Sequence, residues 1–270
     1  MQIDPFFQVP QHAVMTSLGE AQLPLLFKEG DYSIFLFVVS KRKVESLLQG
    51  TGLRPAVTFG NRTFVALVMG HYSITSYKPF RFASLAISVE RQFGFRPTSP
   101  WKEIFSRPDH RHMGFYFLNS LLDNQDMVTM GKEIWGFPHS FGGIQLAIEE
   151  SRVRSLVECA HTRKTLFGLD SAGLRFWRMS ALEFTMFSVR GNHILRTLFN
   201  TRCNLDLSLP LRFRLRLGDG QHPMVENLRL LGLDNRRPLL CLNTHQFQGR
   251  IHEGSVVENL DDAPPQSSSL

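Results

Sequence analysis

Cysteine is scarce in this chain, with three among 270 residues, at Cys159, Cys203 and Cys241. Their odd number and wide spacing indicate reduced thiols and argue against a disulfide framework or a cysteine-based zinc site. Long apolar runs are also missing. The longest, Tyr32 to Val39, has the length of a strand, whereas a membrane span needs about 20 residues. Because residues 1–12 lack the pattern of a secretory signal, we expect a soluble cytoplasmic protein that does not bind membranes.

The sequence contains no block of basic residues, although its formal net charge is +6 from 30 Lys and Arg against 24 Asp and Glu. We therefore expect no nucleic-acid partner, and a small carbonyl or carboxylate ligand suits the charge better. Motifs of other enzyme classes are absent as well, including a Gly-rich phosphate loop and a nucleophile elbow. Phenylalanine is abundant, with 23 residues, which predicts a large core and an apolar pocket wall.

Runs of β-branched and aromatic residues predict strands over 31–40, 62–70 and 82–90. A fourth is expected at 211–217, where Leu and Phe alternate with arginine. Its stripe of Arg212, Arg214 and Arg216 is explained either as a solvated face or as a surface for a carboxylate, a phosphate or an acidic partner.

Helical spacing of apolar residues predicts a short helix after Ser40, ending at Gly50 or Gly52. A second helix is expected around 180–200, although Gly191 could split it. No composition shift divides the chain, so we predict a single domain over 1–254. The acidic, Pro- and Ser-rich stretch 255–270 is expected to be a disordered tail.

The most informative stretch is residues 131–143, "GKEIWGFPHSFGG". Together with "YSIFLFVVSKRKVESLL" upstream and the segment around "HPMVENLRLLGLDNRRPLLCLNTHQFQGRIHEG", it resembles the acetoacetate decarboxylase superfamily across roughly residues 25–254. The resemblance implies a mainly β (α+β) fold, in which a large antiparallel sheet closes into a cone or barrel around an apolar pocket. It also implies a few flanking helices and a homo-oligomer. The glycines of the motif are interpreted as a bend or bulge in the barrel wall.

In that family a lysine directly follows the motif's proline, and a second lysine beside it lowers its pKa. Here these positions are His139 and Ser140. Only a neutral amine forms the Schiff base that acts as an electron sink, and an imidazole cannot replace it. A histidine can instead remove a proton alpha to a carbonyl or protonate an enolate. The other interpretation is a hydrogen-bonded histidine at the entrance of a strand.

We therefore predict a lyase, isomerase or dehydratase acting on a small ketone, β-keto acid or polyketide-like molecule without a cofactor. His139 would be the acid/base group, supported by Glu133 and Lys132. On a regular strand, however, these two neighbours would face opposite ways. The alternatives are a non-catalytic binder and a decarboxylase that uses a relocated lysine, Lys132 or Lys78. Expected substrate contacts are Trp135, Phe137, Ser140 and Lys78, with the two aromatics otherwise explained as core.

The stretch "DHRH", residues 109–112, places His110 and His112 on one side if the chain is extended there. Two histidines joined by a distant third ligand could hold a metal ion. Such pairs are common in polar loops, so we expect no metal site.

Overall fold

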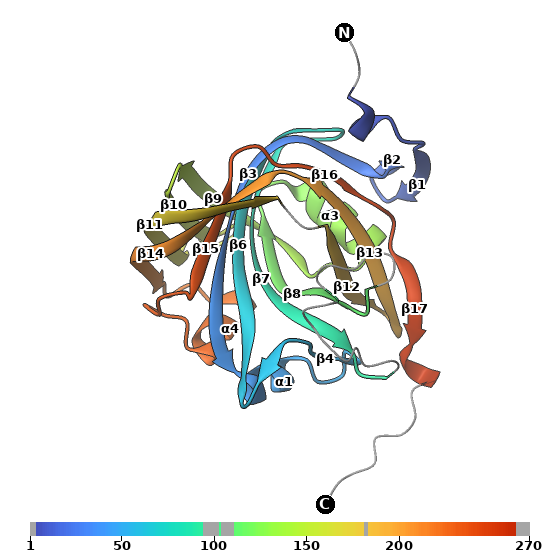
Figure 1. The fold of residues 1–270 in the computed structure, drawn as a ribbon. Coiled ribbons are helices and arrows are strands. Elements are labelled where there is room, and N and C mark those ends of the chain that lie inside the picture. The colour runs from blue at the N-terminus through green and yellow to red at the C-terminus, as the bar shows by residue number, and fades with distance from the viewer. Residues whose placement is uncertain (1–3, 94–102, 104–110, 181–182, 263–270) are drawn as a thin grey trace, which may run out of the picture.

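One long strand organises the fold (Figure 1), and its residues 34–39 are apolar on both faces. This strand, β3 (Leu25–Ser40), lies beside β6 (Arg62–Thr75) on one edge, and beside β15 (Leu240–Thr244) and β16 (Gln248–Ile251) on the other. The computed structural model describes residues 4–93, 103, 111–180 and 183–262. The predicted strands 31–40, 62–70 and 82–90 are confirmed within β3, β6 and β7.

Among the described strands, all others except β1 and β2 join the same sheet, while β1 and β2 form a separate hairpin. Pairing in the large sheet is antiparallel except between β8 and β9 and between β8 and β12. The remaining strands are β1 (His12–Thr16), β2 (Gly19–Leu23), β4 (Leu53–Pro55), β5 (Thr58–Phe59), β7 (Phe80–Arg91), β8 (Met113–Leu122), β9 (His139–Glu149), β10 (Arg152–Cys159), β11 (Thr165–Ser180), β12 (Phe184–Arg190), β13 (His193–Arg202), β14 (Asn204–Leu217) and β17 (Ser255–Asn259).

The large sheet closes on itself twice. One ring of paired strands runs from β3 through β6, β7, β8, β12, β13 and β16 back to β3. The other runs from β3 through β15, β14, β11, β10, β9, β8, β7 and β6. The strands β3, β6, β7 and β8, which cross the centre of Figure 1 side by side, therefore belong to both rings. The expected mainly β fold with a closed sheet is confirmed.

The shared strands separate two apolar interiors because successive side chains point to opposite faces. On β3, Phe35 and Phe37 belong to the core inside the second ring, whereas Ile34 and Leu36 face a cavity inside the first. Since both faces of these strands are buried, their sequences form continuous apolar runs rather than alternating ones.

The helices whose bounds the structure describes are few, as expected: α1 (Lys41–Leu47), α3 (Gln125–Trp135) and α4 (Pro223–Leu231). Short 3₁₀ turns occur at Pro5–Phe7 and Leu260–Asp262. The helix predicted after Ser40 is confirmed as α1. Among the helices of the described residues, none combines the length and apolarity that crossing a membrane would need.

The helix predicted around 180–200 is wrong, because the described part of this segment forms the hairpin β12 and β13. Gly191, with φ +58°, makes the turn. Buried residues on both faces of β12 hide the strand alternation and produce an accidental helical spacing. The disordered tail was predicted to begin at 255, but Ser255–Asn259 forms β17 and pairs with β13. In β14 the three arginines of the stripe are exposed, while Leu215 is buried.

Candidate functional site

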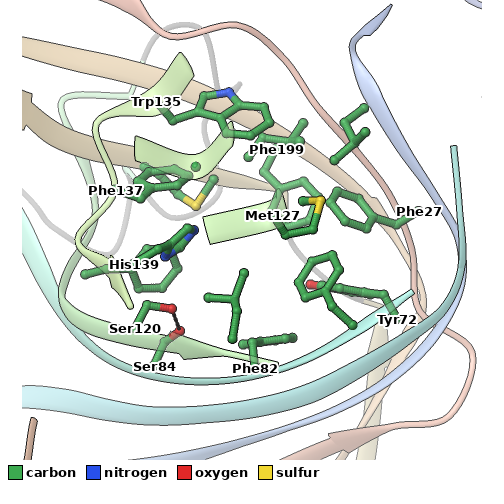
Figure 2. A pocket seen from close by; sticks show the side chains of 17 residues that line it. Phe27, Tyr72, Phe82, Ser84, Ser120, Met127, Trp135, Phe137, His139 and Phe199 are labelled. Atoms are coloured by element: carbon green, nitrogen blue, oxygen red, sulfur yellow. Dashed lines mark hydrogen bonds between the residues drawn. The ribbon is translucent and has the colours of Figure 1, made fainter. Parts of the chain in front are cut away.

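The first ring encloses a cavity of about 80 Å³ beside α3, which we call the His139 cavity (Figure 2). Its wall is formed by aromatic and aliphatic side chains from strands and by one face of α3. Figure 2 shows His139, Ser120 and Ser84 together on one side, with Phe27 and Tyr72 on the other. The lining residues are Leu25, Phe27, Tyr72, Phe80, Phe82, Ser84, Phe117, Ser120, Leu122, Met127, Gly131, Trp135, Phe137, His139, Met186, Phe199 and Ile251.

A larger cavity of about 280 Å³ lies next to the first, and we call it the second cavity. The two share the side chains of Tyr72, Phe82, Phe117, Met186 and Phe199. The other residues that line the second cavity are Tyr32, Ile34, Leu36, Ala66, Val68, Ala86, Phe115, Met179, Phe184, Leu205, Leu242 and Phe247.

The motif of residues 131–143 is the end of a helix followed by a strand, and not a bend within the barrel wall as the sequence suggested. Helix α3 begins after Asn124, whose side chain accepts hydrogen bonds from the amides of Asp126 and Met127. It ends at Gly136, which has φ +65°. The amide of Phe137 then donates to the carbonyl of Gly131 at 3.0 Å, as in a helix terminus that reverses through a left-handed glycine. Strand β9 starts at His139.

His139 projects from the first residue of β9 into the cavity, between Phe137 and α3. Its ring centroid is 5.4 Å from that of Phe137. Part of the ring faces the empty volume, and protein surrounds the rest. Burial away from water, assisted by the positive charge of Lys132, lowers the pKa of His139 from 6.5 to about 3. The imidazole is therefore neutral near pH 7, and its Nδ1 has no hydrogen-bond partner within the described residues.

Two buried serines lie next to His139 in the cavity wall. The hydroxyls of Ser84 on β7 and Ser120 on β8 are 2.6 Å apart, and the two residues are opposite each other in the sheet. One hydroxyl donates to the other, which leaves one further hydroxyl hydrogen for a third group. Ser120 is also the pairing partner of His139 between β8 and β9. Strand register thus brings all three polar side chains together.

Lys132 and Glu133 lie on the outer side of α3 and are exposed. Both oxygens of the Glu133 carboxylate accept hydrogen bonds from Ser17, from its amide at 2.8 Å and its hydroxyl at 2.6 Å. These bonds lower the pKa of Glu133. The helix therefore anchors the β1–β2 hairpin through Glu133. Neither residue lines the cavity with His139, because the face of α3 that does so carries Met127, Gly131 and Trp135, and Lys132 and Glu133 are exposed to solvent.

Lys78 is exposed and forms an ion pair with Asp126 at the start of α3. Its hydrogen bond to that carboxylate raises the pKa of Lys78, whereas an imine-forming lysine needs a lowered one. No described lysine lines either cavity, and Lys102 lies outside the described residues.

The remaining predicted contact residues divide between two locations. Trp135 and Phe137 line the cavity with nearly parallel rings, their centroids 6.0 Å apart. Ser140 points away from it, as the next residue along β9, and its Oγ is 3.1 Å from Nε2 of His222. Nδ1 of His222 accepts a hydrogen bond from the amide of Met224, so Nε2 carries the proton and donates to Ser140. Ser140 and His222 thus connect β9 with the start of α4.

Of the histidine pair in "DHRH", His110 lies outside the described residues. His112 contacts Glu103, with Nδ1 and Oε1 separated by 3.2 Å. In the described part of the chain, no group of three or more His, Cys, Asp or Glu side chains is arranged to hold a metal ion.

Ser84 and Ser120 were not found by reasoning from the sequence, nor was the second cavity. The available signal was serine within two apolar runs, Ser84 with Ser88 in "FASLAISVE" and Ser120 in "FYFLNSLL". Such serines are also common in ordinary strands. What makes these two notable is their cross-strand register with each other and with His139, which depends on the parallel pairing of β8 and β9.

Comparison with known proteins agrees with the fold. The family model "Acetoacetate decarboxylase (ADC)" matches residues 10–181. A search of the curated proteins finds no match.

Solved structures with the same fold include acetoacetate decarboxylase from Legionella pneumophila, with a TM-score of 0.64 and 11% identity, covering 94% of this chain and 93% of that one. An acetoacetate decarboxylase-like enzyme from Sphingomonas wittichii RW1 has a TM-score of 0.58 and 12% identity, with coverages of 87% and 94%. The enduracididine biosynthesis enzyme MppR, in complex with pyruvate, has a TM-score of 0.57 and 13% identity, with coverages of 87% and 91%.

Proposed function

Because the chain belongs to the acetoacetate decarboxylase family, we propose that it is an enzyme acting on a small ketone, β-keto acid or polyketide-like molecule by proton transfer rather than imine formation. The observation that carries the proposal is His139. It faces the cavity at the motif position where the family resemblance places a lysine, and no described lysine lines either cavity. The reaction class is that of a lyase, isomerase or dehydratase.

The proton-transfer step uses the neutral imidazole. A carbon-hydrogen bond alpha to the substrate carbonyl breaks, the proton moves to a ring nitrogen of His139, and the electron pair forms an enolate. Return of the proton to another carbon gives an isomer, and loss of a β-hydroxyl as water gives a dehydrated product. Because burial disfavours the imidazolium, His139 gains basicity only as negative charge develops beside it on the substrate.

Ser84 and Ser120 suit the role of stabilising that negative charge. Their mutual hydrogen bond of 2.6 Å leaves one hydroxyl hydrogen free to donate to the carbonyl oxygen as it becomes an enolate. Donors that are already oriented in a dry cavity stabilise developing charge more than donors in water. Their position next to His139 in the strand register supports a carbonyl group lying between the serines and the imidazole.

A second candidate function is a non-catalytic protein that binds an apolar or oxo-acid metabolite in the cavity. It is favoured by the absence of any carboxylate from the described lining of the His139 cavity, since acid/base enzymes commonly use two titrating groups. Turnover of a panel of oxo acids separates the candidates, because a binder shows only saturation. His139→Ala should abolish turnover if the protein is an enzyme, and should change binding only modestly if it is not.

We also propose that the chain forms a homo-oligomer through exposed apolar side chains on β11 and β14. These are Leu174, Phe176, Trp177, Leu209 and Leu211, and each is about half exposed or more, with Trp177 at 64%. Leu174 and Leu209 are opposite each other in the sheet. Large apolar side chains exposed on neighbouring strands are typical of protein contacts.

A further inference from the structure

The wall of the second cavity is almost entirely hydrocarbon. Among its described lining residues, only Tyr32 and Tyr72 carry a polar side-chain group. Both phenols are deeply buried, and burial raises the pKa of each, so neither supplies charge. A water molecule in such a space would lack most of its hydrogen bonds, because a buried water needs two to four polar partners. The cavity is therefore matched to an apolar occupant.

Apart from the two tyrosines, the polar side chains belong to the first cavity. His139, Ser84 and Ser120 line only the first cavity, whereas Ile34, Leu36 and other aliphatic residues line only the second. Between them stand five shared side chains, four of which are aromatic. An unbranched chain requires less space between these side chains than a fused ring system does.

We propose that the second cavity holds the unbranched hydrocarbon chain of an amphiphilic carbonyl compound whose carbonyl lies at His139. A volume of about 280 Å³ corresponds to roughly nine water-sized units at ~30 Å³ each, which is similar to a chain of about eight to ten carbons. The position of the carbonyl rests on the proposed function. The chain-binding role of the second cavity rests on its own lining.

The test measures the affinity of unbranched methyl ketones, from butanone to tridecanone, for the wild-type protein by calorimetry. Burying one methylene contributes about 0.8 kcal/mol, so each added carbon should tighten Kd about fourfold until the cavity is full. We expect the tightest binding at about ten to twelve carbons, which is a chain of eight to ten carbons plus the carbonyl carbon and its methyl group, followed by weaker binding of longer chains. An affinity that does not depend on chain length overturns the inference, as does tighter binding of a fused-ring ketone of equal carbon number.

Variants that resize the second cavity make the assignment specific. Ala66 and Ala86 are cross-strand neighbours in its wall, and Ala66→Leu or Ala86→Leu should move the preferred chain length downward by several carbons. Leu36→Ala should move it upward, so the inference can still be tested if an overpacked variant fails to fold. Ala147→Leu, on the exposed side of β9, is the matched control and should leave the preference unchanged. An identical preference in all four variants contradicts the assignment.

These experiments distinguish an error in the chain-binding proposal from an error in the proposed function. Chain-length-dependent binding without chemistry would retain the second cavity as the chain site and remove only the proposed proton transfer. Turnover of short oxo acids, with binding that does not depend on chain length, would support the proton transfer and remove the second cavity as the chain site.

Discussion

The imidazole of His139 packs directly against the backbone of Gly131, one turn before the end of α3. A Cβ placed on Gly131 would lie 2.0 Å from Cδ2 of His139, a distance at which one group must move. The glycine is thus the residue that lets a helix pass beside a histidine facing the cavity. Glycine lowers helix stability by about 1 kcal/mol relative to alanine, but alanine at this position would clash with the imidazole.

Gly131→Ala should therefore lower the free energy of unfolding by about 1–3 kcal/mol, because the added methyl displaces the ring. Combined with His139→Ala, which removes the ring, the same substitution should be neutral or stabilising by up to about 1 kcal/mol. Denaturant unfolding of the wild type, both single variants and the double variant measures this coupling. Equal effects of Gly131→Ala in both backgrounds would show that the two residues are not in contact.

The low pKa of His139 predicts how stability depends on pH. The folded pKa of about 3 lies below the unfolded value of 6.5, so the unfolded chain takes up the proton first as pH falls. The contribution of His139 to the free energy of unfolding is complete above pH 6.5. As pH falls from 6.5 to 3, this contribution is lost at up to about 1.4 kcal/mol per pH unit. His139→Gln should remove this part of the slope, as measured by denaturant unfolding at several pH values. Parallel curves for the variant and the wild type would mean that His139 titrates normally.

Imine chemistry makes a contrary prediction that mass spectrometry tests. Borohydride added with acetoacetate reduces any Schiff base to a stable adduct on lysine. We expect an unchanged intact mass, since Lys78 is paired with Asp126 and Lys132 is exposed. A reduced adduct on either lysine would instead establish a decarboxylase with a relocated lysine.

The assembly proposal predicts that Trp177→Asp lowers the oligomeric state, because a charge cannot be buried in an apolar contact without a partner. Light scattering after size exclusion measures the mass directly. Leu230→Asp, at a similarly exposed apolar residue on α4, is the control and should keep the wild-type mass. A monomeric wild-type protein, or equal effects of both substitutions, would remove β11 and β14 from consideration as the interface.

Much of the sheet was predictable, because runs such as 31–40 and 62–70 have only one reasonable interpretation. The hairpin at 184–202 was not, since strands buried on both faces lose the alternation that distinguishes them from helices. His139 was identified through a resemblance at one motif. Its neighbours Ser84 and Ser120 depend on the register of β7, β8 and β9. Lys132 and Glu133 were expected on a strand. They lie on a helix that the sequence did not indicate, because "GKEIW" begins with glycine, which is uncommon within helices.

Hydrogen exchange on a bound ketone tests the central claim most directly. In deuterated water, NMR would follow loss of the α-proton signals of nonanone with wild type, with His139→Ala and with His161→Ala, whose side chain is exposed. The account predicts enzyme-dependent exchange for wild type and His161→Ala, and at least a hundredfold slower exchange for His139→Ala, consistent with the ~10²–10⁴-fold contribution of acid/base catalysis. Exchange at equal rates in all three proteins, or none with the wild type, would contradict it.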